Sequence, residues 1–254
     1  MSVQFETQEH VALITLDRPE ARNAINGVMA TGIESALDRY ESDDSLWAAI
    51  LTANGPVFCA GADLKEIAAG NAGATATAKG GFGGIVQRVR SKPLIAALQG
   101  PALAGGCEIA LACDMIVSSN EAFFSLPEVK RALIAVAGGL FRLPRAIGMA
   151  QAMEVILTGE PLSAERAYQL GLVNRLAPPT EVRDTALALA RQIASNAPLA
   201  VQASRNLAAR AFAADDTTLW REGFEAFQQN MQTEDAKEGP RAFIEKRAPR
   251  WKAR

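Results

Sequence analysis

The stretch Gly100–Asp114, GPALAGGCEIALACD, decides the fold, because apolar runs flank two adjacent glycines that are followed by a carboxylate. Its pattern predicts a strand, a tight turn and a helix opened by Gly105 and Gly106. The first turn of a helix leaves backbone N–H groups unpaired at the positive end of its dipole, where they can hold a developing oxyanion. Glu108 lies in that turn and would place a base beside the anion. Alternatively, Glu108 only complements the helix dipole.

The composition is that of an ordinary globular protein. A length of 254 residues suits one large domain or one domain with an appendage. The formal net charge of −2 provides no overall attraction to nucleic acid or to an anionic membrane, so neither is an expected partner. Because the first residues lack the basic and apolar segments of a secretion signal, and no apolar run is long enough to span a membrane, we expect a cytoplasmic protein.

The scarcity of histidine narrows the possible chemistry. His10 is the single histidine and lies in the polar break of an expected hairpin, where a surface role is the simplest interpretation. A single histidine excludes a histidine-rich metal site, so we expect no metal. A Ser–His–Asp triad or a Cys–His pair would need His10 itself. Carboxylates are then the best candidates for proton transfer. Three cysteines lie in apolar segments, which indicates reduced core residues: Cys59, Cys107 and Cys113.

The chain before and after Gly100–Asp114 alternates strands with helices, which predicts an α/β fold with βαβ units. A hairpin is expected first, followed by a helix at Gly27–Tyr40 with Asn26 as its N-cap. The expected strands are Val3–Phe5, Val11–Leu16, Trp47–Thr52, Leu94–Leu98, Met115–Ser118 and Phe123–Leu126. The Gly- and Ala-rich segment Ala68–Gly84 has no period and predicts a mobile loop or a loosely held helix, either a connector or a pocket wall.

Helical patterns dominate the second half of the chain. The expected helices are Leu140–Met149, Gln151–Leu157, Ala164–Leu170, Glu181–Ser195, Leu199–Ala213 and Thr218–Gln232. The last three are long and amphipathic and form a helical appendage after the turn at Pro178–Pro179. Because their apolar stripes have no sheet of their own, they must be buried on the core or on another subunit, and we expect the chain to form oligomers.

A second carboxylate follows at Glu128, after Phe123–Leu126. One helix and two short strands separate it from Glu108, so a chain that folds back once can bring the two side chains together. Two facing carboxylates can divide the roles of acid and base. A solvated glutamate after a strand is the alternative.

Several motifs together resemble the enoyl-CoA hydratase/isomerase (crotonase) family. They occur in the family's order along the chain: Phe58–Lys65 (FCAGADLK), Gly105–Glu108 (GGCE), Pro127–Glu128, Gly138–Pro144 (GGLFRLP), Leu157–Gly159, Gly171–Asn174 and Lys237–Phe243. The resemblance implies a ββα spiral core over residues 1–196 and a C-terminal helical trimerisation region over residues 197–254. It also implies a homotrimer or a hexamer that binds acyl-CoA thioesters.

The resemblance assigns roles to individual residues. The backbone N–H groups of Ala62 and Gly105 would form an oxyanion hole for the thioester carbonyl, Glu128 would supply the proton that reaches Cα, and Glu108 would hold and deprotonate the attacking water. Coenzyme A would lie along the turn that contains Ala60, Ala62, Asp63, Leu64 and Lys65. Lys65 would approach the phosphates of coenzyme A. Lys246 of a neighbouring subunit would approach the ribose phosphate of the same coenzyme A. No cofactor is implied, since coenzyme A is part of the substrate.

Departures from the family pattern leave the substrate open. Ala132 and Ala135 stand where the family commonly has a glycine and a proline, and Ala104 replaces the first of three glycines. The cluster Glu128–Arg131 (EVKR) also resembles branches that act on carnitine-derived or sterol-derived thioesters. The retained carboxylate pair favours an enoyl-CoA hydratase. The alternatives are an isomerase, a thioesterase, or a non-catalytic member that binds acyl-CoA or RNA. The acidic composition disfavours RNA binding.

Overall fold

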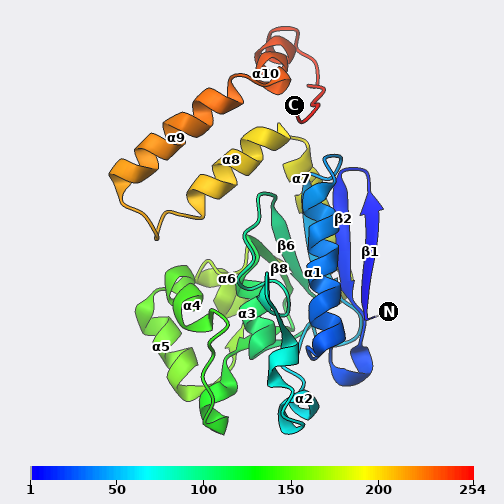
Figure 1. Ribbon diagram of the computed structural model, residues 1–254, viewed down its shortest axis with the longest axis vertical. Coiled ribbons are helices and arrows are strands. Elements are labelled where there is room, and N and C mark those ends of the chain that lie inside the picture. The colour runs from blue at the N-terminus through cyan, green and yellow to red at the C-terminus, as the bar shows by residue number, and fades with distance from the viewer. Residues whose placement is uncertain (1) are drawn as a thin grey trace.

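Six strands form the central sheet of the computed structural model, which describes residues 2–254 (Figure 1). Their order is β1-β2-β3-β6-β8-β11. The bounds are Val3–Gln8 (β1), Val11–Leu16 (β2), Ala48–Ala53 (β3), Leu94–Leu98 (β6), Met115–Ser119 (β8) and Arg175–Ala177 (β11). β1 pairs antiparallel with β2, and every later neighbour pairs in parallel. The predicted hairpin and the predicted parallel α/β sheet are both confirmed.

Both faces of this sheet are buried, as the near-continuous apolar runs predict. On one face, Ile14 and Leu51 pack with the predicted helix α1 (Gly27–Ser42). On the other face, Leu13 and Ile50 pack with α7 (Val182–Ala194), so this helix covers the sheet, which corrects its expected place in an appendage without a sheet. The alternation follows from the period of two along a strand. The oxygen of the Asn26 side chain accepts the N–H of Met29, so the predicted N-cap of α1 is also confirmed.

Short helices and strands surround the Gly100–Asp114 turn. The helices are α2 (Leu64–Ala68), α3 (Gly105–Leu111), α4 (Gly139–Ile147), α5 (Met149–Thr158) and α6 (Ala164–Gln169). A second sheet joins β7 (Ala102–Leu103), β9 (Phe123–Ser125) and β10 (Leu162–Ser163) in the order β10-β9-β7. The predicted strand, turn and helix are therefore present, and α3 begins at Gly105 as expected. β10 and β11 were too short to be predicted from their periodicity.

The segment Ala68–Gly84 is not a single helix, which corrects one of the two sequence interpretations, and the mobility expected of a loop stays a prediction. A 3-10 turn, Ala72–Thr75, leads into a two-stranded hairpin of β4 (Ala76–Thr77) and β5 (Gly81–Phe82). The N–H of Gly83 donates to the carbonyl of Thr75 at 2.9 Å, which closes the hairpin. Three glycines near its end adopt positive φ, a conformation that a periodicity argument cannot detect: Gly81, Gly83 and Gly84.

The last residues form the C-terminal arm, residues 198–254, which extends beyond the sheet (Figure 1). It contains α8 (Pro198–Ala208), α9 (Asp216–Asn230) and α10 (Glu234–Ile244), of which α10 was not predicted. Arg205 of α8 holds the arm to the core, since its Nη2 lies 2.8 Å from the carboxylate of Asp114. Among residues 2–254, no helix is long and apolar enough to cross a membrane.

Candidate active site

Two glycines open α3 because other atoms approach them too closely for a side chain. A Cβ on Gly105 would lie 2.4 Å from the ring of Phe82, and a Cβ on Gly106 would lie 2.2 Å from the carbonyl oxygen of Cys59. Gly105 is the first residue of the helix, so its N–H has no intrahelical acceptor. This N–H is therefore available to a substrate atom.

A second turn, around Ala62, lies against the first. The N–H of Ile25 donates to the carbonyl of Gly61 at 2.8 Å, and the N–H of Asp63 donates to the carbonyl of Ile25 at 2.9 Å. Since both neighbours of Ala62 bond to Ile25, the N–H of Ala62 itself points to the opposite side. A Cβ on Gly61 would lie 3.0 Å from the Gly105 nitrogen, so the two turns are in contact.

The N–H groups of Ala62 and Gly105 are both without a hydrogen-bond acceptor within the described chain. They belong to adjacent turns that are held by backbone hydrogen bonds, so the two donors are fixed before any ligand arrives. Fixed donors of this kind stabilise negative charge that develops on a carbonyl oxygen, because they need no reorganisation. The geometry therefore suits an oxyanion hole.

Glu108 lies one turn further along α3 and is only 3 % exposed. Its Oε1 accepts the N–H of Gly139 at 2.9 Å. Burial raises the pKa of Glu108 to about 7, and the nearby charge of Glu128 also raises it. The N–H groups of Gly139 and Ala137 and the charge of Arg142 act in the opposite direction. A carboxyl group with a pKa near neutrality can both take and give a proton.

Glu128 lies in the 3-10 turn Pro127–Arg131, directly after β9. Its Oε2 is buried and has no hydrogen-bond partner. Burial is the largest cause that raises the pKa of Glu128 above its ordinary value. A buried carboxylate oxygen without a partner is costly unless a ligand or a water completes its bonding. The charge of Glu128 is one of the causes that raise the pKa of Glu108, so the two carboxyl groups lie in the same part of the molecule, and their joint role stays a prediction.

The residues predicted to bind coenzyme A are only partly together. Ala60 and Asp63 lie on the Ala62 turn, and Leu64 and Lys65 begin α2, where both side chains are exposed. The carboxylate of Asp63 is occupied within the protein, because it pairs with Arg18 at 2.7 Å. Lys246 follows α10, which lies at the opposite end of the molecule from α2 (Figure 1). One chain therefore does not bring Lys246 to Lys65.

Gly139 and Arg142 are contributors whose roles the sequence did not show. Both lie in the motif Gly138–Pro144, at the N-terminal end of α4. The guanidinium of Arg142 donates to the carbonyls of Val86 at 2.6 Å and Ala137 at 3.2 Å, which fixes the helix end that holds Glu108. The adjacent glycines before a helix were the available signal, since they allow the backbone to approach a carboxylate.

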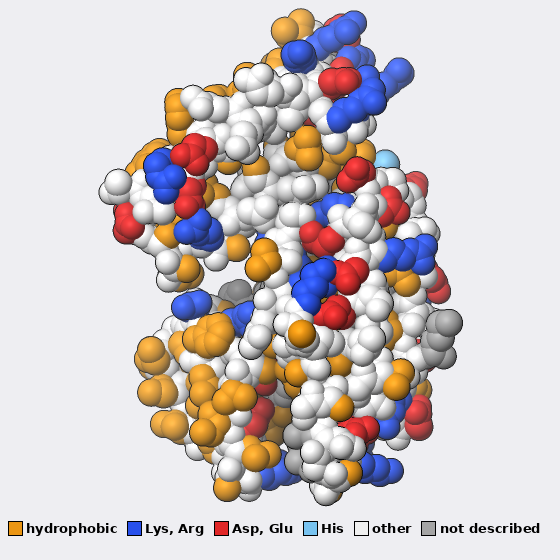
Figure 2. Space-filling view, in the orientation of Figure 1, with side chains coloured by type: hydrophobic (Ala, Val, Ile, Leu, Met, Phe, Trp, Pro, Cys, Tyr) orange, Lys and Arg blue, Asp and Glu red, His pale blue; other side chains and the backbone are white. Residues whose placement is uncertain are grey.

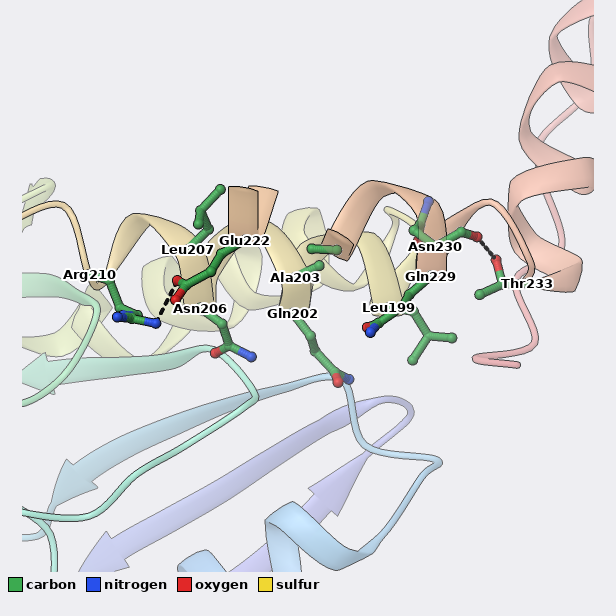
Figure 3. A pocket seen from close by; sticks show the side chains of 11 residues that line it. Leu199, Gln202, Ala203, Asn206, Leu207, Arg210, Glu222, Gln229, Asn230 and Thr233 are labelled. Carbon is green, nitrogen blue, oxygen red and sulfur yellow. Dashed lines mark hydrogen bonds and ion pairs between the residues drawn. The ribbon is translucent and has the colours of Figure 1, made fainter. Parts of the chain in front are cut away.

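A groove of about 460 Å³ lies away from this site, between α8 and α9 (Figure 3). Leu199, Ala203 and Leu207 line it, and the ion pair of Arg210 with Glu222 crosses it at 2.5 Å. None of the predicted site residues borders the groove. The groove is the space between two packed helices, α8 and α9, of the C-terminal arm.

Comparison with known proteins supplies the family. The family model described as "Enoyl-CoA hydratase/isomerase" matches residues 6–254. The chain belongs to the enoyl-CoA hydratase/isomerase family. Its C-terminal arm and its sheet both match the crotonase fold, since an enoyl-CoA hydratase from Mycobacterium tuberculosis H37Rv superimposes with a TM-score of 0.96 at 44 % identity, with 100 % of this chain and 99 % of that one covered.

Two curated relatives of this family carry different names. The chain is 40 % identical over 263 residues to a carnitinyl-CoA dehydratase from Proteus mirabilis, which covers 100 % of this chain and 99 % of the relative. It is 39 % identical over 255 residues to a short-chain-enoyl-CoA hydratase from Clostridium acetobutylicum, with 97 % and 95 % covered. Similarity of this kind supports a hydratase of the crotonase type and leaves the acyl group open.

Two of the departures from the family pattern have a common physical feature. Ala104 has φ 51° and ψ −125°, and Ala132 has φ 53°. Both positions thus require a left-handed backbone, which glycine adopts without steric cost and alanine does not. The family's glycines at these positions are explained by this geometry. The alanines at these two positions therefore place backbone strain in the turns beside the site.

Proposed function

We propose that this protein is an enoyl-CoA hydratase that adds water across the α,β double bond of a 2-enoyl-CoA thioester. The observation that carries the proposal is the combination of two carboxyl groups with raised pKa values, the buried Glu108 and the half-buried Glu128, with the unpaired N–H groups of Ala62 and Gly105. This combination supplies the acid, the base and the anion stabilisation that hydration of a conjugated thioester needs.

The mechanism assigns one role to each group. Glu108 holds a water molecule and takes its proton as the oxygen attacks Cβ. The two donors stabilise the enolate that forms on the thioester oxygen, and Glu128 then delivers a proton to Cα. Burial raises the pKa of Glu108 to about 7 and also raises the pKa of Glu128, which favours a division of the base and acid roles between the two carboxyl groups.

A second candidate is the reversible dehydration of carnitinyl-CoA, which uses the same two carboxylates. The 40 % identity to the relative from Proteus mirabilis favours it. Lys130 and Arg131, which follow Glu128, are exposed, and Lys130 pairs with Glu160 at 2.7 Å. The two candidates differ in the substituent at the end of the acyl chain and share the chemistry at Cα and Cβ.

The proposal includes an assembly. Three apolar side chains of α9 and that of Met231, which caps its C-terminal end, form one exposed stripe at helical spacing: Trp220, Phe224, Phe227 and Met231. Covering this stripe would require a neighbouring subunit, which supports a homotrimer or a hexamer built through residues 197–254, with residues 1–196 as the core. A neighbour would also be the source of Lys246 for a bound coenzyme A. A cytoplasmic location stays a prediction from the sequence.

The test measures loss of the enoyl thioester absorbance with crotonyl-CoA and with the enoyl thioester that dehydration of carnitinyl-CoA would give. Glu108→Gln and Glu128→Gln should each lower kcat by about 10²- to 10⁴-fold, since each removes one proton-transfer group. Glu154→Gln, an exposed position on α5, is the matched control and should retain activity. Normal turnover in both site variants would refute the mechanism.

The other reactions of the fold give distinct products. A double-bond isomerase leaves the mass of the substrate unchanged, and a thioesterase releases a free thiol of coenzyme A. A member that only binds acyl-CoA gives no product, and an RNA-binding member retains RNA on a filter at moderate salt.

A further inference from the structure

The turn that presents the N–H of Ala62 is held from outside by residues 18–25, the segment that follows β2. The carbonyl of Arg22 accepts the N–H of Ala60 at 3.0 Å. Ile25 bonds to both Gly61 and Asp63, as described above, so the backbone of this segment contacts the turn on both sides of Ala62. The direction of the Ala62 N–H therefore depends on where residues 18–25 lie.

One ion pair locks this segment to the turn. Nη1 of Arg18 lies 2.7 Å from Oδ2 of Asp63 and also donates to the carbonyl of Ala24 at 3.1 Å. The side chains are 21 % and 10 % exposed, so water screens this pair less than an ion pair on the surface. Oδ1 of Asp63 accepts the N–H of Lys65 at 2.9 Å, which ties the same carboxylate to the start of α2.

A buried asparagine fixes the arginine in turn. Oδ1 of Asn23 accepts the backbone N–H of Arg18 at 2.8 Å, and Nδ2 donates to the carbonyls of Asn54 and Val57, both at 2.9 Å. Asn23 is fully buried and has φ 53°, a left-handed conformation that asparagine tolerates better than most residues. The segment is thus anchored to the end of β3 as well as to the Ala62 turn.

We propose that Arg18 is a positioning residue for the hydration reaction, acting through Asp63 to hold the Ala62 N–H at the place where the thioester oxyanion forms. This inference rests on the proposed function. Arg18 makes no contact with Glu108 or Glu128 among the described hydrogen bonds and ion pairs, so its loss should act on the oxyanion donor and leave the proton-transfer groups in place. The hydrogen bond from Arg18 also keeps the pKa of Asp63 below its ordinary value, so this carboxylate stays charged at neutral pH.

The expected effect is on the rate more than on binding. A displacement of about 1 Å at a reacting group can cost up to about 100-fold in rate. We expect Arg18→Met and Asp63→Asn each to lower kcat by about 10- to 100-fold, with a change in KM below about threefold, because the lost interaction is strongest in the transition state. Since both changes break one pair, the double variant should be no slower than the slower single variant.

The matched control removes an exposed ion pair elsewhere. Arg183 of α7 lies 3.3 Å from Glu6 of β1, with side chains 47 % and 55 % exposed, and Arg183→Met should leave kcat and KM unchanged. Thermal unfolding is measured for each variant. Should Arg18→Met not fold, Arg18→Lys, which keeps the charge without the planar fork, takes its place and should still lower kcat.

A spectroscopic readout separates positioning from general destabilisation. Butyryl-CoA labelled with ¹³C at the thioester carbonyl cannot be hydrated, and hydrogen bonds from an oxyanion hole lower its C=O stretching frequency when it binds. The wild type and Arg183→Met should show the full shift and the Arg18 variant a smaller one. No shift in the wild type would refute the oxyanion hole of the proposed function. A full shift in the wild type that persists in the Arg18 variant, or additive losses in the double variant, would overturn the role of Arg18.

Discussion

Replacing Glu108 by glutamine should make the protein more stable at alkaline pH, although it removes a group needed for activity. The pKa of Glu108 is raised from an ordinary value of 4.5 to about 7, because burial penalises its charged form. The folded protein therefore binds this proton more tightly than the unfolded chain. The resulting stabilisation is complete below about pH 4.5 and is lost as the pH rises through about 7.

The magnitude follows from the pKa change. Each tenfold change in proton affinity corresponds to about 1.4 kcal/mol, so a change from 4.5 to about 7 corresponds to about 3 kcal/mol. Glutamine is never charged, and its oxygen can still accept the N–H of Gly139. The free energy of unfolding of Glu108→Gln relative to the wild type should therefore increase by about 3 kcal/mol between pH 4 and pH 8. For a chain of 254 residues this equals a shift of roughly 6 to 12 °C in Tm.

The assay is thermal unfolding of both proteins at several pH values and one fixed protein concentration. The difference between the two curves isolates Glu108, because every other titrating group is present in both. Glu154→Gln, at an exposed position, serves as the control and should follow the wild type at each pH. If Tm depends on pH in the same way in Glu108→Gln and in the wild type from pH 4 to pH 8, the conclusion that burial raises the pKa of Glu108 is wrong.

Three further predictions concern other parts of the molecule. Ala104→Gly should raise the free energy of unfolding by about 1 kcal/mol, measured in urea, because relief of the left-handed strain exceeds the added entropy of the unfolded chain; a loss of stability would contradict this. Arg142→Met removes a charge that lowers the pKa of Glu108, so the acid limb of the kcat/KM profile should move to higher pH; an unmoved limb would show that Arg142 does not act on Glu108. Placing aspartates at Trp220 and Phe227 should reduce the mass measured by light scattering to that of a monomer, whereas an unchanged mass would remove α9 from the interface.

The elements with strong periodicity were predictable from the sequence. β2 and β3 lie within one or two residues of the expected runs, and α1 and its Asn26 cap follow directly from spacing and capping chemistry. α10 was missed because Gly239 and Pro240 interrupt its pattern, and neither residue suggests a helix interior. Very short strands such as β10 depend on pairing between distant segments, which local periodicity does not report.

The candidate site was predictable as a set of residues and not as an arrangement. Residue type and spacing indicated Glu108, Glu128 and the glycine turn at Gly105, and the resemblance to the family added the Ala62 donor and the separate roles of the two carboxylates. The roles of Gly139, Arg142 and Arg18 depend on contacts across the fold, such as the N–H of Gly139 on Glu108, and a linear pattern does not contain these contacts. Their roles become apparent only when the fold brings the Ala62 turn, the Gly105 turn and the start of α4 together.

The most direct test of the central claim follows the oxygen of water into the product. The protein is incubated with crotonyl-CoA in ¹⁸O-labelled water, and the acyl-CoA product is analysed by mass spectrometry beside a Glu128→Gln sample. Hydration predicts a thioester that has gained one labelled water, with the label on Cβ, and a yield at least about 100-fold lower for the variant. A thioester of unchanged mass, or label found only in a released carboxylic acid, would contradict the assignment as a hydratase.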